Sequence, residues 1–382
     1  MKLRKVAKQP PVAAVPTSAD VARLAGVSRS TISLVLNGRA STVRISLKTR
    51  ERVLSAAAEL GYTPNHAARS LRQRSTKIIT FVLPSLENPY FLEIVSAAQA
   101  EAGARGYSVT IIPSRNELSE FRTALLLQGA AYDGIIVAGH DNCAAPELST
   151  LAARGLAVVV LQEPSPAPRI HSVSVDLEAG GYLATRHLLS LGHRRVAHST
   201  QALRQTRTGR DRIDGYRRAL SEAGLPFDDD LVVVTENSLS GGEAALDRIL
   251  ALPDQPTALF AYNDRLAIGA LHGLRRRGLK VPEEFAVVGF DGIAFGAFTA
   301  PTLTTIDSSR EELGKLAMQA IIDAIEKRAD QKDHLLPVRL VVRESCGAAN
   351  PASQRVSSRK STAIPRPHAS GGNQTDTNGR KK

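Results

Sequence analysis

The stretch Asp20-Val-Ala-Arg-Leu-Ala-Gly-Val-Ser-Arg-Ser-Thr-Ile-Ser-Leu-Val-Leu-Asn37 decides how the first part of this chain folds. Thr17 stands three residues before Asp20, and that spacing predicts a capping box at the start of a first helix. Gly26 can adopt the positive φ that ends this helix. Ser28 is placed to cap a second helix, which stops at Asn37-Gly38.

Apolar residues mark one face on each of these two helices. We expect the faces to pack together, with Val21, Leu24 and Ala25 on the first and Ile32, Val35 and Leu36 on the second. Ala22 is small enough to let the helices cross closely. The start of the second helix then presents outward Arg29, Ser30, Ser33 and Leu34. A third helix is expected from Leu47 to Leu60, capped by Ser46 with Thr49 and closed by Gly61.

Two helices joined in this way form a helix-turn-helix, whose second helix enters the major groove of DNA with its N-terminal end. An ordinary helical subdomain would show the same caps and apolar faces, so the motif alone is a weak signal. The charge distribution adds independent support. Residues 1–77 carry 15 Lys and Arg against 3 Asp and Glu, and residues 351–382 carry 7 against 1. The remaining 78–350 carry 27 against 33, so an acidic body follows a head suited to a polyanion.

Length and composition exclude several classes of protein. The 382 residues are enough for two or three domains, and no apolar run approaches the roughly 20 residues that span a bilayer. The basic start Met1–Lys8 lacks the apolar segment of a signal peptide. Cys143 and Cys346 are the two cysteines of the sequence, and neither lies in a metal-ligand spacing. The sequence therefore predicts a cytoplasmic protein that needs no cofactor or metal.

Beyond residue 77, apolar runs alternate with helical patterns. The runs cover 78–83, 108–112, 134–137, 157–161, 172–175, 196–198, 231–234, 258–261 and 286–289, and the helical patterns cover 89–104, 180–191, 214–223, 242–252 and 265–277. Such alternation predicts an α/β fold with doubly wound parallel sheets covered on both faces. About nine strands exceed one small sheet, which favours two lobes.

Motifs along the whole chain resemble the lac-repressor/gal-repressor family. In the head they are the Ala22–Asn37 stretch, Thr49–Val53, Leu60–Asn65 and Ala68–Leu71. In the body they are Asn88–Phe91, Val175–Gly181, His187–Arg195, Arg212–Tyr216, Asn263–Gly269, Val287–Asp291, Leu303–Ile306 and Arg339–Glu344. The resemblance implies a helix-turn-helix head joined to a two-lobed, periplasmic-binding-protein-like domain, with chain crossings between the lobes near 174–178, 302–308 and 330–336.

The resemblance also implies roles for residues of the head. Base edges would be faced by Arg29, Ser30 and Leu34. Phosphate contact or helix positioning would fall to Thr17, Ser28, Thr31, Ser33, Asn37, Ser46, Thr49, Tyr62 and Asn65. A hinge helix would include Ala68 and Leu71, with the leucine wedged into the minor groove of a palindromic operator bound by a homodimer. The segment 38–45 is longer than the shortest family versions, so no contact is carried over to it.

Candidate ligand residues follow the predicted strands of the body, where ligands of open α/β sheets bind. They are Asn88, Tyr90, Phe91, Gln162, Arg212, Asn263, Asp264 and Asp291. The arginine offers a donor fork, the carboxylates accept from hydroxyls or amines, and the aromatic rings offer an apolar face. Helix capping is the simpler role for an Asn or Asp after a strand, and we expect it at Asp176. These residues suit a polyhydroxylated or a heterocyclic effector.

Two departures from the family pattern leave the identity of the effector open. Gln162 stands where many family members have an acidic residue, and Glu236-Asn237-Ser238 replaces an aromatic platform. An enzyme is disfavoured because no Gly-x-Gly-x-x-Gly, phosphate-loop or Gly-x-Ser-x-Gly motif occurs. His193 and His198 look more like a helix-end residue and a strand residue than a metal pair. A transport-type sugar-binding protein would explain the body but not the head.

The sequence thus predicts a ligand-responsive transcriptional regulator, most often a repressor in this family. Its expected parts are a basic arm (1–16), a helix-turn-helix domain (17–63), a hinge and linker (64–77), a two-lobed effector-binding and dimerisation domain (78–347) and a basic tail (348–382).

Overall fold

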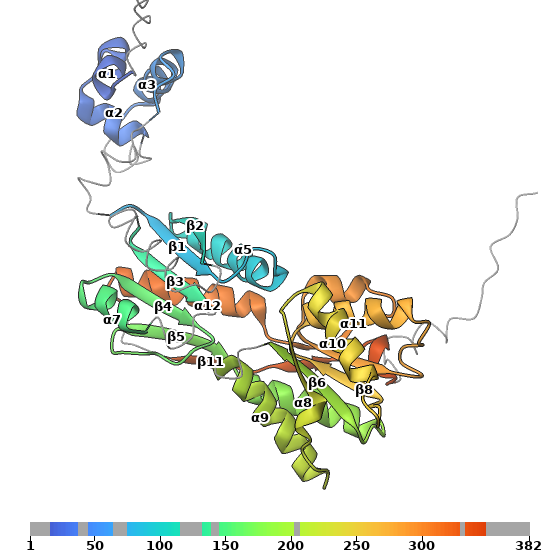
Figure 1. Cartoon of the computed structure of the whole chain (residues 1–382). Coiled ribbons are helices and arrows are strands. Elements are labelled where there is room, and N and C mark those ends of the chain that lie inside the picture. The colour runs from blue at the N-terminus through green and yellow to red at the C-terminus, as the bar shows by residue number, and fades with distance from the viewer. Residues whose placement is uncertain are drawn as a thin grey trace, which may run out of the picture. The chain divides into compact units, whose positions relative to one another are not determined.

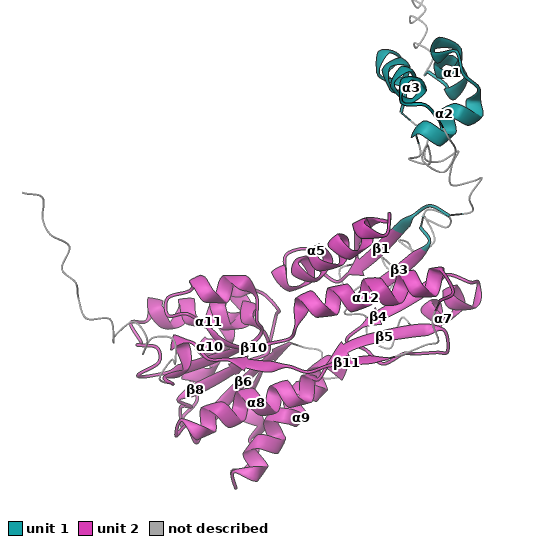
Figure 2. Ribbon diagram, turned by 180° about the vertical axis from the view of Figure 1, so that it is seen from behind, with its two compact units in different colours: residues 1–78, 128–133 teal, residues 79–127, 134–382 magenta. Residues whose placement is uncertain are grey.

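The computed structural model describes residues 16–36, 45–63, 75–114, 132–138, 145–201, 207–328 and 333–348. The chain divides into two compact units (Figure 2). Unit 1 comprises residues 1–78 and 128–133, and unit 2 comprises residues 79–127 and 134–382. Residues 1–15 of the predicted arm, the hinge positions 64–74 and most of the predicted tail lie outside the described residues.

Unit 1 contains the three predicted helices, α1 (Ser18–Ala25), α2 (Arg29–Leu36) and α3 (Leu47–Glu59). The predicted caps are confirmed. The Thr17 amide and hydroxyl both donate to the Asp20 carboxylate, at 3.0 and 2.6 Å, and Gly26 ends α1 with a φ of 62°. The Ser28 hydroxyl accepts from the Thr31 amide, and the Ser46 hydroxyl accepts from the Thr49 amide.

The core of unit 1 differs from the prediction at one residue. It is formed by Val21, Ala22, Ala25, Ile32, Val35, Val53, Ala56 and Ala57. Leu24 was expected to pack inside but is 47% exposed. Val21, Ala22 and Ala25 form the buried stripe of α1, and the helical spacing places Leu24 beyond the edge of this stripe, where it is left in solvent.

Unit 2 consists of two α/β lobes, each built on one six-stranded sheet (Figure 1). The N-terminal lobe has the order β11-β5-β4-β3-β1-β2. Its strands are β1 (Ile78–Leu83), β2 (Ser108–Pro113), β3 (Gly134–Ala138), β4 (Ala157–Leu161), β5 (Ile170–Val175) and β11 (His334–Leu336). Its helices are α5 (Pro89–Ala104), α7 (Ala145–Ala153) and α12 (Arg310–Ile325).

The C-terminal lobe repeats this topology with the order β7-β6-β8-β9-β10-β12. Its strands are β6 (Val196–Gln201), β7 (Val232–Thr235), β8 (Ala258–Ala261), β9 (Ala286–Asp291), β10 (Thr304–Asp307) and β12 (Arg339–Val341). Its helices are α8 (Leu177–Ser190), α9 (Arg207–Glu222), α10 (Leu239–Leu250) and α11 (Asp264–Arg276). The β10–β12 pair is antiparallel, and the other pairs described in this sheet are parallel.

All nine predicted apolar runs lie on strands, but β10, β11 and β12 were not counted among them. These three strands have three or four residues and carry polar or charged side chains, so they lack a continuous apolar signal. Helices α7 and α12 were also missed. The two lobes therefore contain more strands and helices than the sequence pattern predicted.

The chain passes between the lobes three times. The passages are at Asp176 (β5 to α8), Ser308-Ser309 (β10 to α12) and Pro337-Val338 (β11 to β12). The first agrees with the predicted 174–178, and the second lies at the end of the predicted 302–308, because Thr304–Asp307 still form β10. The third lies just beyond the predicted 330–336, because Leu336 still pairs with Val175 in the N-terminal sheet.

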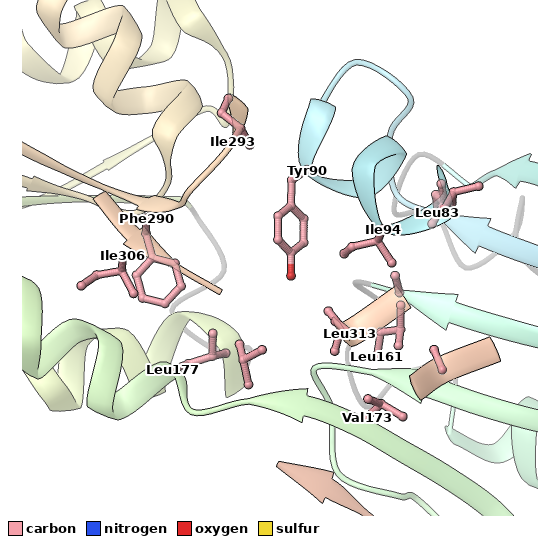
Figure 3. Packing of buried hydrophobic residues seen from close by; sticks show 14 of the residues in the cluster. Leu83, Tyr90, Ile94, Leu161, Val173, Leu177, Phe290, Ile293, Ile306 and Leu313 are labelled. Carbon is pink, nitrogen blue, oxygen red and sulfur yellow. The ribbon is translucent and has the colours of Figure 1, made fainter. Parts of the chain in front are cut away.

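One apolar core continues through both lobes. Its buried residues include Phe81 and Leu161 from the N-terminal sheet and Phe260 and Phe290 from the C-terminal sheet. In Figure 3, Tyr90 projects from α5 between Phe290 on one side and Ile94 and Leu313 on the other. The core therefore brings the loops after the strands of both lobes together. Among the described residues, no helix is long and apolar enough to cross a membrane.

Candidate functional site

Side chains that follow the strands of the two lobes meet around Tyr90. This tyrosine is 3% exposed, and its hydroxyl accepts a hydrogen bond from the Gln162 amide. Burial raises the pKa of Tyr90, and the nearby Asp291 carboxylate raises it further, against the lowering effect of Ser308 and Arg212. Asp291 and Arg212 belong to the C-terminal lobe, so the site draws groups from both lobes.

Arg212 is the central cation of this site. It is 2% exposed, and its guanidinium carbon lies 4.3 Å from the ring centroid of Tyr262 and 4.2 Å from that of Phe290. One guanidinium nitrogen donates to the Thr208 carbonyl at 2.8 Å, and the other lies 3.7 Å from the Asp291 carboxylate. Nε has no hydrogen-bond partner among the described residues. A buried donor held between two aromatic rings is prepared to bind an acceptor. Arg212 lies in the second turn of α9, which begins at Arg207, seven residues before the predicted helical pattern 214–223.

Asp291 has an unusual backbone and an unusual pKa. It ends β9 with a φ of 103°, a conformation that costs a non-glycine residue about 1–3 kcal/mol. Burial raises the pKa of its carboxyl to about 7, although Arg212 and Arg310 lower it. The Glu93 carboxylate raises the pKa of Asp291 further. A carboxyl with this pKa can both accept and donate hydrogen bonds near neutral pH.

This pKa predicts how stability depends on pH. Between about pH 4 and pH 7 the unfolded chain ionises this carboxyl while the folded chain keeps it protonated, so the free energy of unfolding falls as pH rises. Asp291→Asn should flatten this slope and be more stable than the wild type at pH 8 by about 2–4 kcal/mol. Urea unfolding of the wild type and the variant at pH 5 and pH 8 measures the pH dependence of the unfolding free energy and the difference between the two proteins at pH 8. Equal slopes in variant and wild type would contradict the assignment.

Three of the predicted ligand residues have structural partners. Asn88 caps α5 through the Tyr90 amide. Asn263 caps α11 through the Leu266 amide and donates to Asn237 at 2.8 Å. Both carboxylate oxygens of Asp264 are occupied, by the Thr305 hydroxyl at 2.5 Å and the Ile293 amide at 2.8 Å.

The remaining aromatic candidate lies beside Tyr90. The ring of Phe91 packs edge-on against that of Tyr90, with 5.2 Å between the centroids. The structure thus brings Tyr90, Gln162, Arg212 and Asp291 into one cluster, and holds Asn88, Asn263 and Asp264 in the framework around it. Asp176 caps α8, as predicted.

Sequence reasoning missed three residues of this site. Ser308 and Arg310 follow β10, which was not recognised as a strand, although a polar residue after a strand was the signal used elsewhere. The third, Glu93, lies one helical turn after Tyr90 and therefore on the same side of α5. The three-residue spacing between Tyr90 and Glu93 in a predicted helix could have indicated that both face the site.

In unit 1, most of the described candidate DNA-contacting residues lie at the start of α2 and α3, while Thr17 caps α1 and Tyr62 follows α3. Ser28, Arg29, Ser30 and Ser33 are exposed, and Thr31 and Leu34 are half-buried. The Ser28 hydroxyl lies 2.6 Å from that of Ser30 and 2.9 Å from that of Thr31. Thr17 and Ser46 are exposed, and Thr49 and Tyr62 are half-buried. The candidate positions Asn37, Asn65, Ala68 and Leu71 lie outside the described residues.

The segment that follows the predicted hinge is fixed by one carboxylate. Asp133 accepts from the Thr76 amide and hydroxyl at 2.6 and 2.8 Å, and from the Ser75 hydroxyl and Lys77 amide at 2.5 and 3.0 Å. These hydrogen bonds lower the pKa of Asp133. Four donors on one side chain fasten the segment just before β1 to the residue just before β3.

The two candidate metal histidines have the ordinary roles that the sequence favoured. His198 is buried in β6, where Nδ1 lies 2.9 Å from the Phe260 carbonyl, and His193 follows α8 and lies 2.8 Å from the Thr257 hydroxyl. Within the described ranges, no group of three His, Cys, Asp or Glu residues could hold a metal ion.

Comparison with known proteins identifies both parts of the chain. Residues 17–65 match the family of bacterial regulatory proteins of the lacI type. Residues 76–344 match the periplasmic binding proteins and sugar-binding domain of the LacI family. The regulator DegA of Bacillus subtilis (strain 168) is 34% identical over 337 residues, which cover 87% of this chain and 98% of DegA. The repressor PurR of Mannheimia succiniciproducens is 31% identical over 331 residues, or 86% of this chain and 98% of PurR.

Solved structures agree with these matches. The lac repressor dimer bound to operator has a TM-score of 0.76 at 29% identity, covering 87% of this chain and 99% of that one. The transcriptional regulator CelR in complex with cellobiose has a TM-score of 0.65 at 31% identity, covering 86% and 99%. These matches extend over nearly the full length of each relative. The chain belongs to the LacI family of transcriptional regulators.

Proposed function

We propose that this regulator is a cytoplasmic, homodimeric repressor, without enzymatic activity, whose affinity for a palindromic operator is set by a small effector bound between its two lobes. The exposed start of α2 carries the proposal for DNA. Arg29 and Ser30 are free to reach base edges there, because Ile32 and Val35 anchor the opposite face of the helix in the core. The lac repressor neighbour was solved as a dimer on operator, which supports the same assembly here.

The effector site is carried by the buried cluster of Tyr90, Arg212 and Asp291. An arginine that donates and a carboxyl that accepts, next to aromatic rings, suit neighbouring hydroxyls of a sugar-like ligand. The CelR neighbour was solved with cellobiose, which supports this class. We therefore propose the class of ligand and not the compound.

The link between the two sites runs through the start of β1. Asp133 holds residues 75–77 to the strand pair of the N-terminal lobe, so a movement of that lobe reaches the segment that leads toward the head. Effector binding would change the separation of the two hinge segments of a dimer, in which we place Asn65, Ala68 and Leu71. A coupling free energy of about 1–3 kcal/mol is typical of such a link.

A selection of bound DNA from genome fragments tests this function. We expect an enriched palindrome, whose affinity falls steeply with salt because Lys and Arg displace counterions from phosphates. Repeating the binding measurement with metabolite pools and with cellobiose identifies the effector. Absence of an enriched sequence both with and without metabolites would contradict sequence-specific binding.

Arg29 provides a residue-level test. Arg29→Ala should weaken binding to the selected operator by about 10–100-fold, because a good contact to a base edge is worth roughly 1–3 kcal/mol. Binding to unrelated DNA should change much less. Arg186→Ala removes one exposed positive charge from unit 2 and serves as the charge-matched control. Equal losses on operator and unrelated DNA would exclude a base contact by Arg29.

A further inference from the structure

The loop 291–294, which follows β9, is held by side chains along its whole length. The Asp291 carbonyl accepts from the Ser308 hydroxyl at 3.1 Å and from Arg310. The next three amides each donate to a side chain: Gly292 to Thr305 at 3.3 Å, Ile293 to Asp264 at 2.8 Å and Ala294 to Glu93 at 3.1 Å. This dense set of partners explains how the strained backbone of Asp291 is maintained.

Two of these partners, Glu93 and Arg310, come from the N-terminal lobe. Thr305 and Asp264 belong to the C-terminal lobe, as does the loop itself. Glu93 lies on α5 of the N-terminal lobe. Its second carboxylate oxygen accepts from Arg310 Nε at 2.7 Å within the N-terminal lobe, so Glu93 binds the loop directly and also holds the arginine that binds the Asp291 carbonyl.

Arg310 connects this contact to the passage between the lobes. It is the first residue of α12, directly after the second crossing, and 16% of its side chain is exposed. Besides Glu93 it binds the Asp291 carbonyl and, at 3.1 Å, the Asp307 carboxylate. Asp307 is in turn bound by Arg339 of β12, at 2.7 and 2.9 Å. Glu93 is therefore joined through Arg310 to the strands that enter and leave the hinge.

We infer that Glu93 is a closure latch: it holds the lobes together and, by binding the loop 291–294 and Arg310, it fixes Asp291 in its ligand-binding orientation only when the lobes are closed. Glu93 is a positioning residue, because it acts through the loop and Arg310. The bond from the Ala294 amide to Glu93 and the bond from Arg310 to the Asp291 carbonyl are both lost when the lobes separate, whereas the charge-assisted Glu93–Arg310 pair stays within the N-terminal lobe. The consequence for ligand binding rests on the function proposed above, but the latch itself does not.

A second contact between the lobes serves as the matched control. Glu87 pairs with Arg265 of α11 at 2.8 Å, so this pair also joins the two lobes. The Glu87 side chain is 79% exposed, and it contacts neither the loop 291–294 nor Arg310 in the described contacts. An exposed ion pair of this kind contributes little to stability. Glu87→Ala should therefore leave the lobes closed.

Distances between the lobes test the latch in the full chain without effector. Spin labels on cysteines introduced at Arg154 and Arg275, both exposed, report on the N-terminal and C-terminal lobes, with Cys143 replaced by serine and Cys346 left buried. Glu93→Ala should raise the ratio of open to closed lobes about tenfold, which is about 1.4 kcal/mol. Glu93→Gln, which keeps an acceptor but loses the charge, should give a smaller shift. Unchanged distances in Glu93→Ala would overturn the proposal.

Amide hydrogen exchange distinguishes a latch from general destabilisation. In Glu93→Ala the Ala294 amide should exchange about tenfold faster, while the Ile293 amide, held by Asp264 within its own lobe, should keep its protection. Loss of protection at both amides would mean that the lobe is destabilised as a whole and would overturn the latch. The two proposals can fail separately. If Glu93→Ala opens the lobes but neither the metabolite pools nor cellobiose contain an effector, the latch stands and the proposed ligand function is rejected.

Discussion

Replacing Arg212 by alanine is expected to abolish the response to effector while leaving operator binding without effector largely intact. The guanidinium is buried between Tyr262 and Phe290 and has an uncommitted Nε, so it is the strongest donor that the site can offer a ligand. A hydrogen bond to a charged group contributes about 1.5–3 kcal/mol, and the aromatic stacking is lost as well. We expect effector affinity to fall at least about a hundredfold. Titration of the operator complex with the effector that acts on the wild type measures this.

Two variants make the result specific. Arg210→Ala removes an exposed arginine from the same helix and should keep the full response. Arg212→Lys retains the charge but not the planar fork that stacks between the rings, and it should not restore the response. A fully responsive Arg212→Ala protein would remove this residue from the effector site. Loss of operator binding without effector would instead indicate a damaged fold, because Arg212 lies far along the chain from unit 1.

The second large effect is expected at the crossing of α8 and α9, where Gly181→Ala should destabilise the C-terminal lobe and disturb the site. A Cβ atom added at Gly181 would overlap the Arg212 backbone carbonyl, and one added at Gly215 would overlap the Glu178 carbonyl. The two helices approach so closely that backbone must move to admit a methyl group. Overpacking typically costs about 1–3 kcal/mol, and we expect the upper end or more because backbone atoms are the obstacle.

The control for this substitution is another helical glycine. Gly103 of α5 has open space where a Cβ would stand, so Gly103→Ala should be neutral or stabilising by up to about 1 kcal/mol. Urea unfolding of both variants gives the free-energy change, and effector titration tests whether Gly181→Ala also weakens binding through Arg212. Equal stability of Gly181→Ala and the wild type would contradict the close crossing.

The sequence predicted the parts of the fold in which local signals are strong. Thr17, Ser28 and Ser46 cap helices where their spacing to the following residues indicated, because a cap depends on three or four neighbouring residues. The apolar runs of the body became strands because buried parallel strands are apolar along their whole length. Both signals are local, so no knowledge of the tertiary structure was needed. Leu24 shows the limit: its exposure depends on which flank of α1 packs against the other two helices, and this is a property of the tertiary structure.

The candidate ligand residues show the same division. That polar residues follow β1, β8 and β9 could be read from the sequence. Which of them face a ligand could not be read from the sequence. An Asn or Asp after a strand can cap a helix, join a hydrogen-bond network or line a binding site, and the neighbouring residues look the same in all three cases. The structure assigns Asn263 to a cap, Asp264 to the loop 291–294, and Asp291 to the place beside Arg212.

By itself, the sequence thus determined that a capped three-helix head precedes two lobes of alternating strands and helices, and which residue types stand at the strand exits. Only the tertiary structure decided that Glu93 of α5 meets the loop after β9, about two hundred residues later in the chain, and that Arg310 lies between them. The physical reason is that capping and hydrophobic periodicity act between near neighbours, whereas the raised pKa of Asp291 arises from groups that only the folded chain brings together.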